Sequence, residues 1–371
     1  MAHRIRRTLV LLAAAAGLSA ASAAAADLKS LVKDLHAVPS TTGNEEMLAA
    51  KVRASLPKGL AVEEDGLGTI AVRLTGAAGP TLLLAALDGY GHMVSGIMPD
   101  GHLTVDRPVA PPHARFDAYL LGQPVIVSTA RGPVPGVVAQ PALHLLTQER
   151  RRLLVEGFSL ENAFIDIGAR SEREARAKGV ELLDPVTYPA VITELAGGKW
   201  SGPSLGTKAL AAVLVDAAAA PREAAAGGEI IVAWAAQTKF AARGRGARPP
   251  LGVVRAQARW RPRRAVLVDV VAAGKGDAGP VAGRGPVLVS AGTSPLARAL
   301  AALAAAEGLP LQLQTGPGSP LALPFSDPPS EAVTLALPVQ YLNTPSETIS
   351  LRDLQALRDL LAAFLTKGEG R

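Results

Sequence analysis

The segment GPSLG, residues 202–206, has residue types and spacing that could support nucleophilic chemistry. In Gly-x-Ser-x-Gly hydrolases the serine occupies a sharp turn between a strand and a helix, and a histidine activates its hydroxyl. No histidine follows Ser204, because the last of the six histidines is His144. A helical pattern follows the segment, but a glycine-rich loop precedes it. We therefore favour a structural role in which Ser204 or Ser201 caps the next helix.

Other polar motifs are also better explained by structure than by chemistry. Ser30-Leu31-Val32-Lys33 matches Ser-x-x-Lys, but it lies in an amphipathic helical pattern without the companion motifs of penicillin-recognising enzymes. No two of His92, His102, His113 and His144 have the spacing of a His-x-x-x-His ligand pair, so we interpret them as structural or surface residues. The chain has no cysteine, which excludes disulfides, thiolate metal sites and a cysteine nucleophile.

The elements that would position such residues follow two periodicities. Apolar residues three or four apart predict helices within residues 27–56 and over 207–219, 295–307 and 351–365. Apolar runs predict strands over 69–74, 81–87, 229–235, 264–271 and 333–337. Strands that alternate with helices predict an α/β fold with a parallel or mixed sheet covered on both faces.

A stretch in the first half of the chain has a different texture. Short β runs at 123–129, 136–139 and 163–167 alternate with Pro/Gly turns such as RGPVPG. We predict a small β domain over residues 91–186, inserted into the α/β domain. The α/β domain is then expected to comprise residues 27–90 and 187–371.

The first 26 residues predict export. Arg4, Arg6 and Arg7 precede an apolar run over residues 8–18 that is too short to span a bilayer, and small residues up to Ala26 offer cleavage sites. We favour an ordinary secretory signal peptide over a twin-arginine signal, which Arg6-Arg7 also fits. No later segment has 18 consecutive uncharged apolar residues, so we expect a soluble mature protein in the periplasm or outside the cell.

The composition favours a folded chain without a nucleic-acid partner. Hydrophobic residues make up 49% of the 371 residues, which excludes a disordered chain. The formal charge is +6, but basic residues are dispersed except for Arg259, Arg261, Arg263 and Arg264 around Trp260. No nucleic-acid motif surrounds this cluster, and we interpret it as a solvated loop.

Several segments resemble one family of metallopeptidases. LLLAALDGYGHMV (82–94), GKWSGPSLG (198–206), IIVAWAAQTKF (230–240), AVLVDV (265–270) and LPVQYLNTPSE (337–347) resemble its metal-site segments. DGLGTIAVRL (65–74), GVVAQPALHLL (136–146) and AFIDIGARSEREARAKGVELLDPVTY (163–188) are similar to stretches between them. The family is that of the glutamyl or tetrahedral aminopeptidases, some labelled endoglucanases, and the resemblance covers residues 28–365.

The resemblance implies a fold and a reaction. The fold is a three-layer α/β/α sandwich of the zinc-peptidase type with an inserted β domain, through which family members assemble. The reaction uses two zinc ions bridged by a carboxylate and a water, and a nearby glutamate accepts the water's proton.

Most of the family's metal positions are changed in this chain. The changed positions are Ala86 for the first histidine ligand, Gly202 for the bridging aspartate, Thr238 for the glutamate base, Lys239 for the ligand after it, and Asn343 for the terminal histidine. Asp88, which orients the first histidine in the family, and Asp269, a ligand, are retained. We therefore expect no metal and no catalytic residue of the family's kind, and these seven residues are expected to line a vestigial pocket.

We further hypothesise that Lys239 replaces the charge of the metal. Asp88 and Asp269 would otherwise be buried carboxylates without a partner, which is costly. An ammonium within about 4 Å of both would neutralise them. The same ammonium would repel an incoming cation.

These observations predict an exported homologue of aminopeptidases that is catalytically inactive. Its cleft is expected to bind a peptide or small carboxylate ligand or to support a partner, with homo-oligomer formation through the inserted domain. The alternative is an active or residual metal-dependent aminopeptidase or hydrolase whose metal site has been rebuilt from other ligands.

Overall fold

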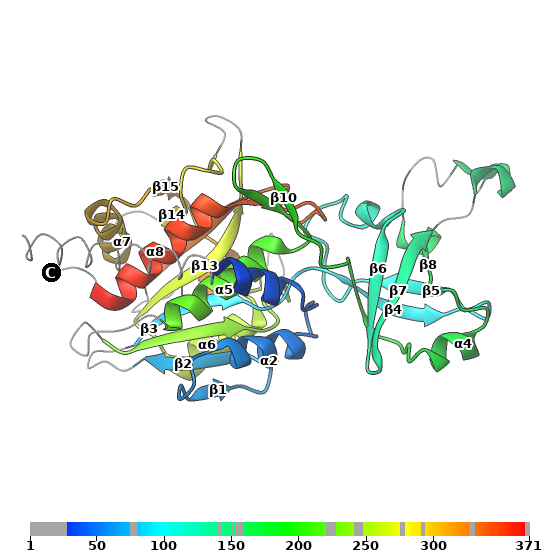
Figure 1. Ribbon diagram of the computed structural model, residues 1–371, viewed down its shortest axis with the longest axis horizontal. Coiled ribbons are helices and arrows are strands. Elements are labelled where there is room, and N and C mark those ends of the chain that lie inside the picture. The colour runs from blue at the N-terminus through cyan, green and yellow to red at the C-terminus, as the bar shows by residue number, and fades with distance from the viewer. Residues whose placement is uncertain are drawn as a thin grey trace, which may run out of the picture.

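The computed structural model describes residues 28–74, 80–139, 142–149, 151–152, 157, 159–219, 228–240, 248–274, 279–290, 294–325 and 331–367. The predicted signal peptide, residues 1–26, lies outside this part of the chain. Figure 1 shows a larger body of helices around a sheet, beside a smaller body of strands. The chain enters the smaller body between β3 (Thr81–Ala86) and β4 (His92–Ile97), and returns between β9 (Pro185–Thr187) and β10 (Thr193–Leu195).

The larger body is built on one mixed sheet. Its strand order is β1-β2-β12-β3-β13-β16-β17-β11-β10, and β14 and β15 extend the sheet beside β16. The bounds not yet given are β1 Val62–Glu64, β2 Ile70–Leu74, β11 Lys199–Ser201, β12 Ile230–Ala235, β13 Arg264–Ala272, β14 Val287–Ser290, β15 Gln312–Thr315, β16 Glu331–Gln340 and β17 Thr348–Ser350. Strands β12, β3, β13 and β16 pair in parallel, and their apolar runs are buried because helices or turns cover both faces.

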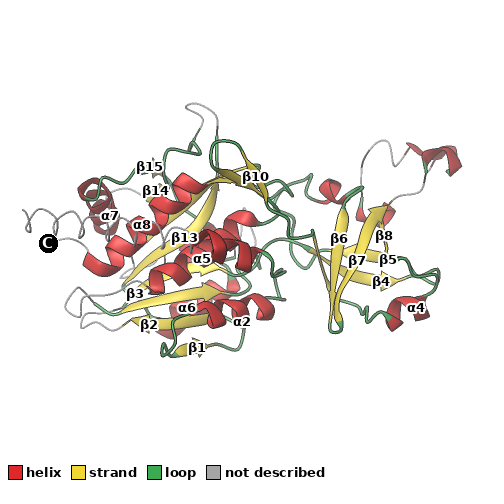
Figure 2. Ribbon diagram, in the orientation of Figure 1, coloured by secondary structure: helices red, strands yellow, loops and turns green. Residues whose placement is uncertain are grey.

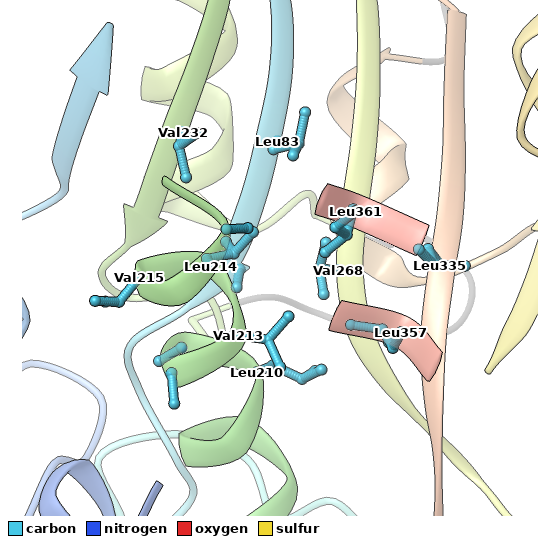
Figure 3. Close-up of a cluster of buried hydrophobic side chains, with 14 of the residues drawn as sticks. Leu83, Leu210, Val213, Leu214, Val215, Val232, Val268, Leu335, Leu357 and Leu361 are labelled. Atoms are coloured by element: carbon cyan, nitrogen blue, oxygen red, sulfur yellow. The ribbon is translucent and has the colours of Figure 1, made fainter. Parts of the chain in front are cut away.

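Helices cover both faces of this sheet, as Figure 2 shows. The described helices are residues 28–36, α2 Glu46–Ser55, α5 Leu205–Ala219, α6 Leu251–Trp260, α7 Pro295–Ala306 and α8 Leu351–Lys367. On one face α5 and α8 pack over the central strands, where Leu214 and Leu361 meet Leu83 and Val268 (Figure 3). On the opposite face α6 and the 3-10 turn η4 (Pro320–Phe325) pack on the alternate residues of the same strands.

The smaller body is a closed barrel with its own core. Its strand order is β4-β5-β8-β7-β6-β9, with β5 Leu103–Asp106, β6 Pro124–Thr129, β7 Gly132–Ala139 and β8 Phe164–Asp166. Its buried residues form a cluster separate from the sheet core, and the short helix α4 (Glu172–Ala177) packs against them. The prediction of a three-layer α/β/α sandwich with an inserted small β domain is confirmed. No helix in the described ranges is long and apolar enough to cross a membrane.

Two local expectations were wrong, the second of them only in part. The RGPVPG stretch is not a turn, because Pro133 and Pro135 lie in β7 and pair only with β6. Pairing of β7 with β8 involves only residues from Val137 onward, so the prolines stand where no second strand needs their N–H groups. The arginine cluster is a loop only in part. Arg261 and Arg263 lie in the exposed connection between α6 and β13, but Arg259 and buried Trp260 end α6, where both contact the Glu63 carboxylate, and Arg264 begins β13.

Candidate functional site

The residues at the family's metal-site positions lie where the parallel strands of the larger sheet end. Ala235, the last residue of β12, pairs in parallel with Ala86, the last residue of β3. Asp88 and Thr238 therefore follow neighbouring strands by two and three residues and meet at the same edge. Ala86 itself is buried at this edge, with only 3% of its surface exposed.

Asp88 is fully buried, and four hydrogen bonds satisfy both of its oxygens. Oδ1 accepts from the Thr238 amide at 2.9 Å and from the Thr238 hydroxyl at 2.6 Å. Oδ2 accepts from the Lys239 amide at 2.8 Å and from the Thr42 hydroxyl at 2.8 Å. The carboxylate that orients a histidine in the family now holds three loop segments together.

The residue directly before α2, Glu45, also forms hydrogen bonds beside Asp88. The N-cap of α2 is Glu45, and no side chain caps this helix. The Glu45 carboxylate turns back to accept from the amides of Gly43 at 2.9 Å and Gln237 at 2.8 Å. Burial, together with the negative charge of Asp88, raises the pKa of Glu45 to about 7.

Lys239 does not form the predicted ion pairs. Within the described part of the chain, no carboxylate oxygen lies within 4.0 Å of its ammonium, which instead faces the Tyr90 ring at 5.9 Å. Burial by itself lowers the pKa of Lys239, but the charges of Asp269 and Asp88 outweigh this effect and raise the pKa above its usual value. Lys239 is therefore a stable cation that acts on the carboxylates at longer range.

Asp269 and Asn343 occupy the neighbouring part of the same edge. Asp269 Oδ2 accepts from the Ser319 hydroxyl in a very short contact, and Oδ1 accepts from the Val270 amide at 2.8 Å. Asn343, in a left-handed conformation with φ of 61°, donates its amide to Glu347 Oε1 at 3.0 Å. The Asn343 carbonyl lies 3.3 Å from His113 Nε2, which links this edge to the barrel.

Glu347 ties the turn before α5 to the loop after β16. Its Oε2 accepts from the Gly206 amide at 3.1 Å, and its carbonyl accepts from the Gly202 amide at 2.9 Å. Burial raises the pKa of the Glu347 carboxyl despite the amides of Asn343 and Gly206 and the charge of Lys239. This carboxyl is 4% exposed and belongs to the hydrogen-bonded frame of the site.

Space for a side chain at the bridging position has been lost. A Cβ added to Gly202 would lie 2.7 Å from the Val191 carbonyl oxygen and 3.2 Å from His36 Nε2. His36 is itself fixed, because Nε2 lies 3.0 Å from the Pro203 carbonyl. Burial lowers the pKa of His36, so its neutral form fills the space. An aspartate at this position would displace the backbone.

Two cavities meet at a common wall. A small cavity of about 40 Å³ is bordered by Lys239, Asn343 and Glu347. A larger cavity of about 330 Å³ lies between the sheet edge and the barrel, and buried Lys208 borders it. The wall is lined on both sides by Tyr90, Tyr188, Pro203 and Ser204.

Comparison with known proteins places this geometry in a family. The family description of the M42 glutamyl aminopeptidases matches residues 68–360. The chain belongs to the M42 family. It is 25% identical over 349 residues to the lysyl aminopeptidase of Pyrococcus furiosus, covering 90% of this chain and 96% of that protein. It is 27% identical over 334 residues to the putative aminopeptidase FrvX of Escherichia coli, covering 81% and 84%.

Solved structures of M42-type peptidases have the same fold. An aminopeptidase from the archaeon Desulfurococcus kamchatkensis superposes with a TM-score of 0.79 at 21% identity, covering 93% of this chain and 96% of that one. The TET1 peptidase of Pyrococcus horikoshii superposes with a TM-score of 0.77 at 24% identity, covering 92% and 99%. That protein is described as assembling into a tetrahedron or a large octahedral shell.

The two zinc ions of M42 chemistry do not fit the side chains present. In the described ranges, no three His, Asp or Glu side chains are grouped so that they could hold a metal ion. Asp88 is saturated by hydrogen-bond donors, and Gly202 has no room for a bridging carboxylate. We therefore derive no metal-dependent step from this structure.

Three residues of this M42 site were missed by sequence reasoning. Glu45, Lys208 and Glu347 are all buried, and each has a shifted pKa. Glu347 stands in LPVQYLNTPSE and Glu45 in PSTTGNEE, residues 39–46, so their polarity beside apolar runs was a visible signal. Lys208 offered a weaker signal, as one of two charged residues, with Asp216, in an otherwise largely apolar helix.

Proposed function

We propose that this chain is an exported M42-family protein without the metal-dependent aminopeptidase reaction of its family. In this proposal the edge of the sheet is a non-catalytic cleft that binds a small carboxylate or the end of a peptide. The observation that carries the proposal is the occupied bridging position, where Val191 and His36 leave no room for a side chain at Gly202. The saturation of Asp88 supports the same conclusion, because each donor would have to be displaced before this carboxylate could take another role.

Lys239 favours a carboxylate ligand. Its ammonium borders the smaller cavity, is held as a cation by nearby charges, and has no carboxylate within 4.0 Å among the described residues. A cavity of about 40 Å³ admits a single functional group, so the remainder of a ligand would extend toward the barrel. A ligand carboxylate beside Lys239 would complete an ion pair that the chain itself does not provide.

Metal content and peptidase activity test the loss of the family reaction. The mature protein, purified without chelator, should contain no stoichiometric zinc, cobalt or manganese. It should not release p-nitroaniline from glutamyl, lysyl or leucyl p-nitroanilide, even after these metals are added. One or more tightly held ions per chain, with activity that a chelator removes, would establish the rebuilt metallopeptidase instead.

The ligand role has a separate test. Acetate and acetyl-dipeptides with a free carboxylate should raise the midpoint of thermal unfolding, whereas the matching amides should not. Lys239→Met should abolish this shift. Lys51→Met is the matched control, because Lys51 is an exposed lysine paired with Asp34 on the surface. An equal shift with amides, or an unchanged shift in Lys239→Met, would refute the assignment.

Export and assembly complete the proposal. We propose cleavage within residues 20–26, which predicts a mature chain that begins at or near Asp27 and is recovered from the periplasm or medium. We also propose homo-oligomers joined through the barrel, since a related TET1 peptidase forms closed assemblies. Intact mass of the exported protein and light scattering of the purified chain measure both. A full-length chain in the cytoplasm would contradict the proposed export, and a strict monomer would contradict the proposed oligomer.

A further inference from the structure

The GPSLG segment has the local geometry of a nucleophile turn. Strand β11 ends at Ser201, and α5 begins at Leu205, so Ser204 occupies the sharp turn between a strand and a helix. Its φ is +52°, a left-handed conformation that is uncommon for a residue other than glycine. The glycine-rich loop expected before Ser204 was therefore wrong, because Lys199–Ser201 pairs on both sides with β10 and β17.

The two glycines of the motif are required by packing. A Cβ at Gly202 would lie 2.7 Å from the Val191 oxygen, and a Cβ at Gly206 would lie 2.7 Å from Val270 Cγ1. The close approach of backbone to neighbouring strands at these two positions holds the turn in place. The fold therefore uses both glycines in the way that Gly-x-Ser-x-Gly turns use them.

The Ser204 hydroxyl is not used for structure. In the described part of the chain it makes no hydrogen bond, so the expected helix cap is absent, and Ser201 instead donates to the Ser346 carbonyl at 3.2 Å. The amide of Leu205, the first residue of α5, also has no acceptor among the described residues. An amide that directly follows the serine and heads a helix is placed to stabilise an oxyanion.

A buried amine lies one helical turn beyond Ser204. Lys208 is 3% exposed, and its Nζ makes one hydrogen bond, to the Val38 carbonyl at 2.9 Å. Burial lowers the pKa of Lys208 to about 7, and the negative charges of Asp88 and Glu45 oppose this shift only in part. The remaining nearby ionisable group is His36, on which the Lys208 charge acts to lower the pKa. A neutral amine is therefore available as a base near neutral pH.

Ser204 and Lys208 both line the larger cavity, of about 330 Å³. The rest of its lining is largely apolar and includes Leu120, Ile126 and Val186. The cavity also borders Ser128, whose buried hydroxyl has no hydrogen-bond partner in the described ranges. A cavity of this size and polarity suits an acyl chain or an aromatic ester better than a charged peptide.

We propose that Ser204 and Lys208 form a serine-type acyl-transfer site that hydrolyses esters of apolar carboxylic acids. The neutral Lys208 amine takes the proton of Ser204 Oγ as Oγ bonds to the ester carbonyl carbon. The Leu205 amide binds the resulting oxyanion. The Lys208 ammonium returns the proton to the departing alkoxide, which leaves as an alcohol. Water, deprotonated by the same amine, then attacks the acyl-serine and releases the acid and Ser204.

In the free protein Lys208 Nζ is bonded to the Val38 carbonyl and not to Ser204 Oγ. The neutral amine keeps one further N–H and a lone pair, and rotation about the side-chain bonds would turn that lone pair toward Ser204 Oγ when an ester fills the cavity. The reaction needs no metal and is separate from the proposed loss of aminopeptidase activity. Either proposal can fail while the other stands, because a chelator affects only a metallopeptidase.

Labelling with an alkyl fluorophosphonate tests the proposal on the full mature chain. The wild-type protein should gain one label per chain, mapped by peptide mass to Ser204, and Ser204→Ala should gain none. Lys208→Met should label at least tenfold more slowly, while Ser201→Ala should label as wild type does. Thermal unfolding of each variant verifies that it is folded. Labelling of native Ser204 no faster than in the denatured chain would overturn the proposal.

The pH dependence and substrate range provide the second measurement. The wild-type labelling rate should rise through a pH of about 7 as Lys208 loses its proton, and the Lys208→Met rate should lack this rise. Hydrolysis of p-nitrophenyl butyrate and octanoate should follow the same pH profile and survive chelator. Turnover that persists in Ser204→Ala, or that chelator removes, would assign the hydrolysis to another site.

Discussion

The ends of β3 and β12 and the ends of β13 and β16 share one edge of the sheet, yet their polar groups are satisfied differently. At β3 and β12, Asp88 is fully buried and accepts four hydrogen bonds. At β13 and β16, Asp269 has one side-chain partner, Ser319, and its remaining bond is to its neighbour's amide. The Asp88 carboxylate thus joins three segments of the chain, whereas the Asp269 side chain is tied to one other segment, and residues of both regions line the small cavity between them.

This difference indicates how a fold can lose a metal site and remain stable. Retained carboxylates must find new partners, because an unpaired buried charge is costly. Asp88 found backbone and hydroxyl donors that replace the lost histidine. Asp269 is 9% exposed and has one side-chain donor, Ser319, so it required less compensation.

The largest expected effect is from Asp88→Ala. It would leave two hydroxyls and two backbone N–H groups without their acceptor, at a cost of about 3 to 5 kcal/mol in the free energy of unfolding. Urea denaturation measures this value. Asp269→Ala should cost about 1 to 2 kcal/mol, because it removes the acceptor of one hydroxyl and of the neighbouring Val270 amide. Equal losses in the two variants would contradict the contrast between the regions.

The next effect is a minimum of stability near neutral pH. Glu45 has a folded pKa raised from 4.5 to about 7, so its contribution is present below pH 4.5 and is lost as the pH rises through 7. Lys208 has a folded pKa lowered from 10.5 to about 7, so its contribution is present above pH 10.5 and is lost as the pH falls through 7. The change in the free energy of unfolding should amount to roughly 3 kcal/mol on the acidic side and roughly 4 to 5 kcal/mol on the alkaline side.

Urea denaturation at a series of pH values measures these slopes. Glu45→Gln should flatten the acidic slope and leave the alkaline one, whereas Lys208→Met should do the reverse. Stability that is greatest near pH 7 in the wild type would show that the two groups are not buried together as this structure has them.

Gly202→Asp sharpens the comparison by restoring the family's bridging residue. Because its Cβ would press on the Val191 carbonyl, we expect a loss of about 2 kcal/mol and no stabilisation by added zinc. Thermal unfolding with and without zinc measures both. Gly66→Asp is the matched control, since a Cβ there meets only the end of Arg255, at 3.9 Å. If zinc stabilised the Gly202→Asp variant, the site could still bind metal, and the proposed loss of the metal site would be wrong.

The smallest effect is expected from Asp269→Asn. The amide oxygen can still accept from Ser319, and only the neighbouring Val270 amide loses its side-chain acceptor, so the loss should be about 1 kcal/mol. Asp88→Asn is the comparison, because an NH₂ group replaces one of two oxygens that each accept two bonds. If Asp269→Asn lowered the free energy of unfolding more than Asp88→Asn does, the bonds of Asp269 would contribute more to stability than those of Asp88, which contradicts the comparison.

Much of the fold and part of the site could be predicted from the sequence. The apolar runs of β3, β12 and β13 begin and end within one or two residues of their expected bounds, because buried parallel strands have little choice of residue type. Short strands such as β11 and β17 were missed, since three residues carry too little pattern. Lys239 was placed at the correct edge, but its side-chain direction was wrong.

The sequence by itself determined that this chain has the layered fold of its family and that most ligand types are absent, since residue identity decides what can coordinate a metal. Only the tertiary structure decided what replaced them. His36 lies 167 residues before its partner Pro203, and Asp88 and Thr238 are 150 residues apart. Contacts at such separations depend on how strands and helices pack, and local residue patterns do not encode that packing. For the same reason, the left-handed turn at Ser204 and the buried amine of Lys208 became visible only in three dimensions.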